Sequence, residues 1–339
     1  MPETPAEPTP TEIKTPARVS WWMWPQILAL DAPLVALVWQ EVMARAHNVR
    51  LSWEFRLALF LSTWIIYLLD RTLDGIRGET QQTARHAFCI QHRKLILGLL
   101  LPALGWLLLW TVLFHLPAGA LWQGMALGTL ALTYLAIFAA PGRTMAQALM
   151  LSIAAVAAMG FISQLPVVAE VKLTSSVLLT ALLGSAVLRR VSHTADTLVP
   201  KQFLGALIFS QACVLASHFW DLGAHLLICR EALLLFGLLA LNLVSISAFE
   251  KNAAGTDGQS EPSARMVEFR LPLALGLLGY LLAGLSDGPL PALDTLVITC
   301  VAALLFVYQL CKSRASAETH HLCADLCLIL PPTVWFLIR

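Results

Sequence analysis

Long apolar stretches separated by short polar segments run through most of the chain. A stretch of about 20 apolar residues is long enough to cross the hydrocarbon core of a bilayer as a helix. We predict eleven such helices, over residues 22–41, 52–71, 94–115, 119–139, 145–165, 174–190, 203–221, 231–250, 270–286, 292–311 and 322–338. The two shortest, 174–190 and 270–286, are the weakest of the set. The pattern therefore predicts an all-α, polytopic transmembrane bundle of about nine to eleven spans.

The composition supports membrane insertion. Hydrophobic residues make up 58% of the 339 residues and charged residues only 13%, which is more apolar surface than a soluble domain can bury. The net charge of +1 gives no indication of nucleic-acid binding. Residues 1–20 are rich in Pro, Thr and Glu and predict a disordered cytoplasmic tail. Residues 21–339 then form the transmembrane domain.

Basic residues are distributed unevenly between alternate connections. The tail and the connections after every second helix hold 16 Lys and Arg, whereas the opposite side holds six. Basic residues gather on the cytoplasmic side of membrane proteins. We therefore expect a multi-pass protein of a bacterial inner membrane with a cytoplasmic N-terminus.

A charged junction follows the second predicted helix. The apolar run LSTWIIYLL ends at Asp70, and Asp74 comes four residues later. If the helix continues for one more turn, both carboxylates project from the same face and can share one cation. Carboxylate oxygens suit Mg²⁺, which keeps positions for waters and substrate phosphates when one or two carboxylates hold it. The spacing predicts a magnesium site for a phosphate-bearing ligand.

Basic side chains surround this acidic pair. They are candidates for binding diphosphate, because guanidinium and ammonium groups pair with phosphate oxygens, and they comprise Arg71, Arg77, Arg85, His86, His92, Arg93 and Lys94. The alternative interpretation is that these charges cap a membrane helix, form local ion pairs and act as a positive-inside signal. The residue types leave both interpretations open.

Two other polar features lie inside predicted spans. Asp31, in LALDAPLVALVW, is a functional candidate, since a carboxylate at membrane depth needs a cavity or a partner. Alternatively, Pro25 and Pro33 break the helix and leave Asp31 in water near the interface. The pair His320-His321 precedes Cys323 and Cys327, which are residue types that bind zinc. The seven scattered cysteines otherwise fit buried positions in apolar helices.

Three further segments on the same side of the membrane can complete the site of Asp70 and Asp74. They are the turn APGRT with Arg143, the segment RRVSHTADTLVPKQ with Asp196 and Lys201, and the segment AFEKNAAGTD with Glu250 and Asp257. Glu250, at a predicted helix end, is the best second acid.

The junction resembles the first aspartate-rich motif of the UbiA superfamily of intramembrane prenyltransferases. That motif reads Asn-Asp-x-x-Asp-x-x-x-Asp at the cytoplasmic end of the second helix, and the matching segment here is WIIYLLDRTLDGIRGE. Leu69 stands at the Asn position, and the two aspartates are separated by four positions rather than three. The closest pattern is the Asp-Arg-x-x-Asp variant of bacterial UbiA-like proteins, which is also followed by Arg-His-x-Phe, here residues 85–88.

This resemblance implies transfer of an isoprenoid from a prenyl diphosphate to an aromatic or lipid-like acceptor, with Mg²⁺ as the cofactor. Together with the polar residues above, it implies catalytic roles for Asp70, Asp74 and Glu250, which would bind the metal with Asp257. Substrate contacts are expected from Tyr67, Arg71, Arg77, Arg85, His86, Lys201 and Asp31. The prenyl chain would lie in the apolar bundle, where Trp64 and Tyr67 can face the developing allylic cation.

Two alignments with the family remain open. In one, Arg143 and Asp196 act as the diphosphate-binding base and the second acid. In the other, Lys201, Glu250 and Asp257 take these roles and a helix pair within 145–190 is an insertion. We prefer the second alignment, because it leaves three spans after the second acid, as in the family.

A non-catalytic membrane carrier or lipid-binding protein with a degenerate UbiA-like fold is the alternative function. Neither candidate segment contains the family's usual second motif, Asp-x-x-x-Asp. Because fold does not determine function, such a protein can keep the bundle without the chemistry.

Overall fold

All regular elements in the part of the chain described by the structure, a computed structural model, are helices. The described residues are 23–77, 84–139, 145–191, 201–220, 230–253, 291–311 and 317–338. The helices are α1 (Trp24–Ile27), α2 (Asp31–Ala46), α3 (Trp53–Arg77), α4 (Ala84–Gln91), α5 (Arg93–Leu95), η2 (Ile96–Leu100), α6 (Leu101–His115), α7 (Ala118–Ala139), α8 (Met145–Gln164), α9 (Ala169–Val191), α11 (Lys201–Trp220), α12 (Arg230–Ala253), α15 (Pro291–Cys311) and α16 (Ala317–Ile338). The all-α prediction is confirmed, whereas the tail 1–20 and the span 270–286 lie outside the described residues.

Within the described ranges, five helical segments are long and apolar enough to cross a membrane. They are Arg93–His115, which joins α5, η2 and α6, and Ala118–Phe138, Lys201–Trp220, Leu293–Cys311 and Thr319–Ile338. They indicate a multi-pass membrane protein. The other spans expected within the described residues also form helices, namely α2, α3, α8, α9 and α12.

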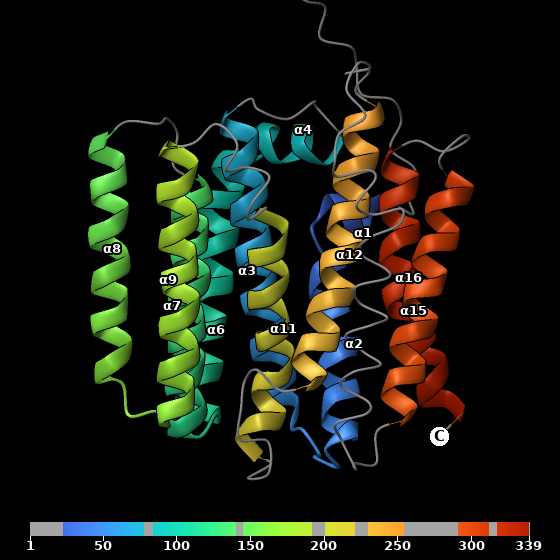
Figure 1. Ribbon diagram of the computed structural model, residues 1–339, viewed down its shortest axis with the longest axis horizontal. Helices are drawn as coiled ribbons and strands as arrows, with labels where there is room; N and C mark the ends of the chain where they lie inside the picture. The colour runs from blue at the N-terminus through green and yellow to red at the C-terminus, as the bar shows by residue number, and fades with distance from the viewer. Residues whose placement is uncertain are drawn as a thin grey trace, which may run out of the picture.

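The helices pack as an elongated bundle (Figure 1). At one edge α8 and α9 pack against each other and against α7, and at the other edge α15 packs against α16. Helix α11 lies between these groups and contacts α2, α3, α7 and α12. The short helix α4 crosses the end of the bundle where α3 finishes, at the top of Figure 1. We call this the α4 end.

The two largest apolar clusters of the described residues fill much of the interior, and α11 contributes to both. The larger cluster joins α2, α11, α12, α15 and α16 around Trp39, which is fully buried. The Trp39 indole N–H donates to the carbonyl of Leu328 at 3.1 Å, so the polar group of this large side chain is satisfied inside the bundle. The second cluster joins α7, α8, α9 and α11.

Large apolar side chains also cover the outer surface. Trp106 and Phe114 on α6, Met150 on α8 and Phe306 on α15 are each about two-thirds exposed. Exposed apolar surface on this scale is unfavourable in water and is expected for helices that face lipid. The outer surface therefore agrees with the prediction of a membrane bundle.

The chain breaks between α1 and α2 rather than forming one helix over residues 22–41. Ala29 adopts a left-handed conformation with φ of 57°, which ends α1 and lets α2 begin at Asp31. Backbone groups freed by such a break need partners inside a membrane protein. Helix α3 supplies two of them, because the Trp64 indole donates to the Leu28 carbonyl at 2.8 Å and the Arg71 guanidinium donates to the Gln26 carbonyl.

Helix α2 ends in a hydrogen-bonded cap. The Val49 N–H donates to the Ala44 carbonyl at 2.7 Å, and the Asn48 N–H donates to the Arg45 carbonyl at 3.1 Å. This is the Schellman arrangement, which requires a left-handed residue after the last helical turn. Asn48 has φ of 56°, and asparagine tolerates this conformation better than most residues.

Candidate functional site

Asp70 and Asp74 lie on successive turns near the α4 end of α3 and contact the same ammonium group. The Lys201 Nζ lies 2.9 Å from Asp70 Oδ1 and 3.1 Å from Asp74 Oδ2. Lys201 is the first residue of α11, so the contact joins two helices 127 residues apart in the sequence. The three side chains are half-buried. The structure thus brings both carboxylates to one ammonium group, while a metal ion shared by the two stays a prediction.

The structure describes the side chains of only some of the basic and acidic residues expected at this site. Arg77, Arg85, His86 and Glu250 belong to helices, but their side chains lie outside the described residues. Asp257, Arg143 and Asp196 also lie outside the described residues. Their roles, and the choice between the two alignments, stay predictions.

Arg71 makes its contacts on another side of α3. Its guanidinium is buried, donates to Asp31 Oδ2 at 2.8 Å and also donates to the Gln26 carbonyl. The Tyr67 ring covers the guanidinium, with 4.5 Å between Arg71 Cζ and the ring centroid. The proposed substrate contacts of Arg71 and Tyr67 stay predictions, but in this structure both side chains are used to hold Asp31 inside the bundle.

Asp31 is buried rather than placed in water at the membrane interface. In addition to Arg71, it lies beside His321 of α16, whose Nδ1 is 3.9 Å from Asp31 Oδ2 and 3.0 Å from Asp325 Oδ2. The Gln26 amide lies 3.1 Å from His321 Nδ1, and the Asn242 amide donates to Asp325 Oδ1 at 3.3 Å. We call these residues the Asp31 cluster.

The sequence interpretation missed the role of Asp325. The sequence groups His321 with His320, Cys323 and Cys327, whereas its neighbours in space are carboxylates and an amide. His320 instead stacks on Phe249, with 4.2 Å between ring centroids. The available signal was a carboxylate inside an apolar span, four residues after a histidine, because residues at this spacing share a helix face.

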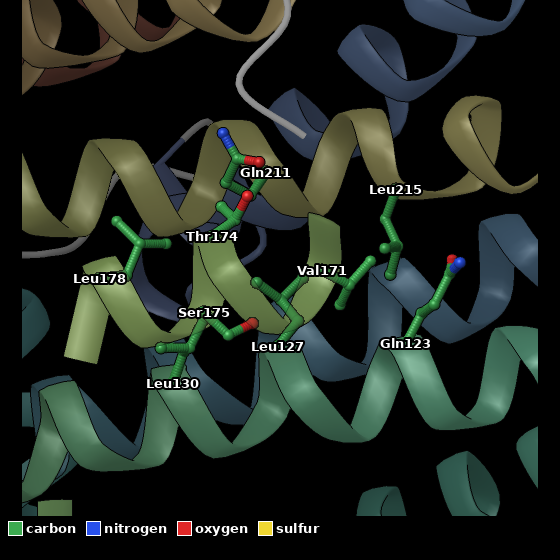
Figure 2. A pocket seen from close by; sticks show the side chains of 9 residues that line it. All are labelled: Gln123, Leu127, Leu130, Val171, Thr174, Ser175, Leu178, Gln211 and Leu215. Atoms are coloured by element: carbon green, nitrogen blue, oxygen red, sulfur yellow. The ribbon is translucent and has the colours of Figure 1, made fainter. Parts of the chain in front are cut away.

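A second polar region lies between α7, α9 and α11. Figure 2 shows a small pocket lined by Leu127, Leu130, Val171, Leu178 and Leu215 together with the polar residues Gln123, Thr174, Ser175 and Gln211. Neither amide atom of buried Gln211 has a hydrogen-bond partner within the described structure. The volume in which the centre of a water molecule fits is about 10 Å³. This is room for one water molecule and far too little for a prenyl chain.

Comparisons with models of known protein families, with curated proteins and with solved structures found no match. They identify no family for the chain. The residues that the structure describes are all-helical in their regular elements and include five candidate membrane spans, and the resemblance to the UbiA superfamily stays a prediction.

Proposed function

We propose that the α4 end binds a prenyl diphosphate through Mg²⁺ and that the protein transfers the prenyl group to a hydrophobic acceptor. The observation that carries this proposal is the contact of Asp70 and Asp74 with the single ammonium of Lys201. The same proposal places the α4 end on the cytoplasmic side of a bacterial inner membrane, where basic residues gather.

The acidic pair fits Mg²⁺. Two carboxylate oxygens that reach one nitrogen at 2.9 and 3.1 Å need only side-chain rotation to reach one ion at about 2.1 Å. Both residues are half-buried near a helix end, so the ion would keep positions for water and phosphate oxygens. Bound there, Mg²⁺ would neutralise charge on the diphosphate leaving group.

Lys201 would change partners when the metal binds. A divalent ion held by Asp70 and Asp74 competes with the ammonium for the same oxygens, which frees Lys201 to donate to phosphate oxygens instead. The positive end of the α11 dipole, where Lys201 lies, attracts the same anion. The lysine would thus hold the carboxylates before binding and the diphosphate after it.

Binding of a fluorescent prenyl diphosphate to the detergent-purified protein tests the first half of the proposal. We expect Mg²⁺ to strengthen binding, and Asp70→Asn or Asp74→Asn to weaken it by at least about tenfold, equivalent to about 1.4 kcal/mol. Glu41→Gln is the control, because Glu41 is a carboxylate paired with Arg45 and Arg56 away from this site. Affinity that is independent of Mg²⁺ and of both aspartates would refute the site.

Turnover decides between an enzyme and a carrier. The protein in lipid vesicles would be given a labelled prenyl diphosphate with quinone, chlorin and glycerol-phosphate acceptors. A prenylated product that disappears in Asp74→Asn supports prenyl transfer. Binding without any product, together with movement of the label across the vesicle membrane, would instead support the carrier.

A further inference from the structure

The Asp31 cluster contains more ligand atoms than its internal hydrogen bonds use. One nitrogen of His321 and one oxygen from each of Asp31 and Asp325 lie within 4.8 Å of one another, and all three residues are buried. They come from two helices, because Asp31 begins α2 while His321 and Asp325 lie one turn apart on α16. These helices pack directly against each other.

Two further observations point to a missing ligand. Asp31 Oδ1 and Asn242 Oδ1 have no hydrogen-bond partner within the described structure, although the two residues are only 5% and 4% exposed. Both side chains are directed toward the cluster by their other atoms, since Asp31 Oδ2 accepts from Arg71 and the Asn242 amide donates to Asp325. Buried oxygens without partners are unfavourable, and a cation would satisfy them.

The charges of the cluster lead to the same conclusion. The described side chains in contact there carry two carboxylates, Asp31 and Asp325, and one guanidinium, Arg71. These two carboxylates outnumber the one guanidinium, and a carboxylate without a compensating cation inside the bundle is costly at low dielectric. A metal ion bound by both carboxylates supplies that charge.

We propose that Asp31, His321 and Asp325 bind one divalent first-row transition-metal ion, such as Zn²⁺ or Mn²⁺, with Asn242 Oδ1 as a further oxygen ligand. The imidazole nitrogen selects such ions over Mg²⁺, which prefers oxygen ligands. Arg71 holds the second oxygen of Asp31, as outer partners of metal-binding carboxylates do. The ion would tie together α2, α12 and α16, and through Arg71 also α3.

This site is separate from the acidic pair of Asp70 and Asp74. Asp70 and Asp74 contact α11 through Lys201, whereas the adjacent Arg71 contacts Gln26 of α1 and Asp31 of α2. The two groups therefore share no side chain and contact different helices, although both involve α3. The metal proposal therefore does not depend on prenyl diphosphate binding.

Metal binding to the full chain in detergent, stripped first with a chelator, tests the proposal. We expect one Zn²⁺ per chain by calorimetry, Mn²⁺ bound at the same site by electron paramagnetic resonance, much weaker Mg²⁺ binding, and a higher thermal midpoint with Zn²⁺. His321→Ala and Asp325→Asn should weaken Zn²⁺ binding by at least about 100-fold, since loss of an outer partner alone costs 10 to 100-fold.

His320→Phe is the matched control. It changes the neighbouring histidine but preserves the stack on Phe249, so Zn²⁺ affinity should stay within about threefold of the unmodified protein. Asp74→Asn should leave Zn²⁺ affinity equally unaffected. If the unmodified protein does not bind Zn²⁺ in a one-to-one ratio, the proposal is overturned without reference to any variant. Equal affinities of His321→Ala and His320→Phe would also overturn it.

Discussion

The buried ion pair of Arg71 and Asp31 should be far more sensitive to mutation than an exposed pair of the same length. Arg71 and Asp31 are 2.8 Å apart, with side chains 6% and 5% exposed. Arg56 and Glu41 are also 2.8 Å apart, but their side chains are 44% and 24% exposed. The two arginines therefore form a comparison in which burial differs and in which Glu41, unlike Asp31, keeps a second arginine, Arg45.

Arg71→Leu should destabilise the protein by about 3 to 5 kcal/mol, the cost of leaving a buried charge without its partner. The pair attraction alone, at about 4 Å between charge centres, is about 4 kcal/mol at an effective dielectric of 20 but about 1 kcal/mol in water. Loss of the guanidinium contact with Tyr67 adds about 1 kcal/mol. Arg56→Leu should change stability by less than about 1 kcal/mol.

The free energy of unfolding can be measured on chelator-treated, metal-free protein by titrating mixed micelles with dodecyl sulfate and following circular dichroism. The double variant Arg71→Leu with Asp31→Leu separates charge from packing, because it removes both members of the ion pair. It should recover most of the stability lost in Arg71→Leu. Equal losses in Arg71→Leu and Arg56→Leu, or no recovery in the double variant, would refute the assignment of the effect to a buried, uncompensated carboxylate.

Three further predictions concern local packing and use the same unfolding assay. Gln211→Leu should stabilise the protein by about 1 kcal/mol, because it removes a buried amide without partners in the described structure; a loss of stability would instead indicate a well-bound water. Asn48→Val should cost about 1 to 2 kcal/mol, since φ of 56° disfavours a β-branched residue, while Asn48→Gly should be neutral or stabilising. Gly119→Ala should be less stable than Gly124→Ala by about 1 to 2 kcal/mol. A Cβ at residue 119 would lie 2.9 Å from the Phe219 ring, whereas a Cβ at residue 124 would meet nothing within 4 Å. Equal stabilities of the two variants would contradict this packing.

Some features of the site depend only on local periodicity, and these could be predicted. The apolar stretches predict the helices, because a membrane span must satisfy its own backbone hydrogen bonds in lipid. The four-residue spacing of Asp70 and Asp74 placed both carboxylates on one face, where they share Lys201. The same spacing places His321 and Asp325 together on α16, so this contact also follows from local periodicity.

Other features depend on which helices become neighbours, and only the tertiary structure decided them. Lys201 is the cation between the two aspartates because α11 packs against α3. Asp31 is the partner of Arg71 because α2 packs against α3. Asp31 meets His321 across 290 residues of chain because α2 packs against α16. Apolar helix surfaces are too similar to specify such neighbours from sequence pattern, whereas each buried charge requires its partner once the helices have packed.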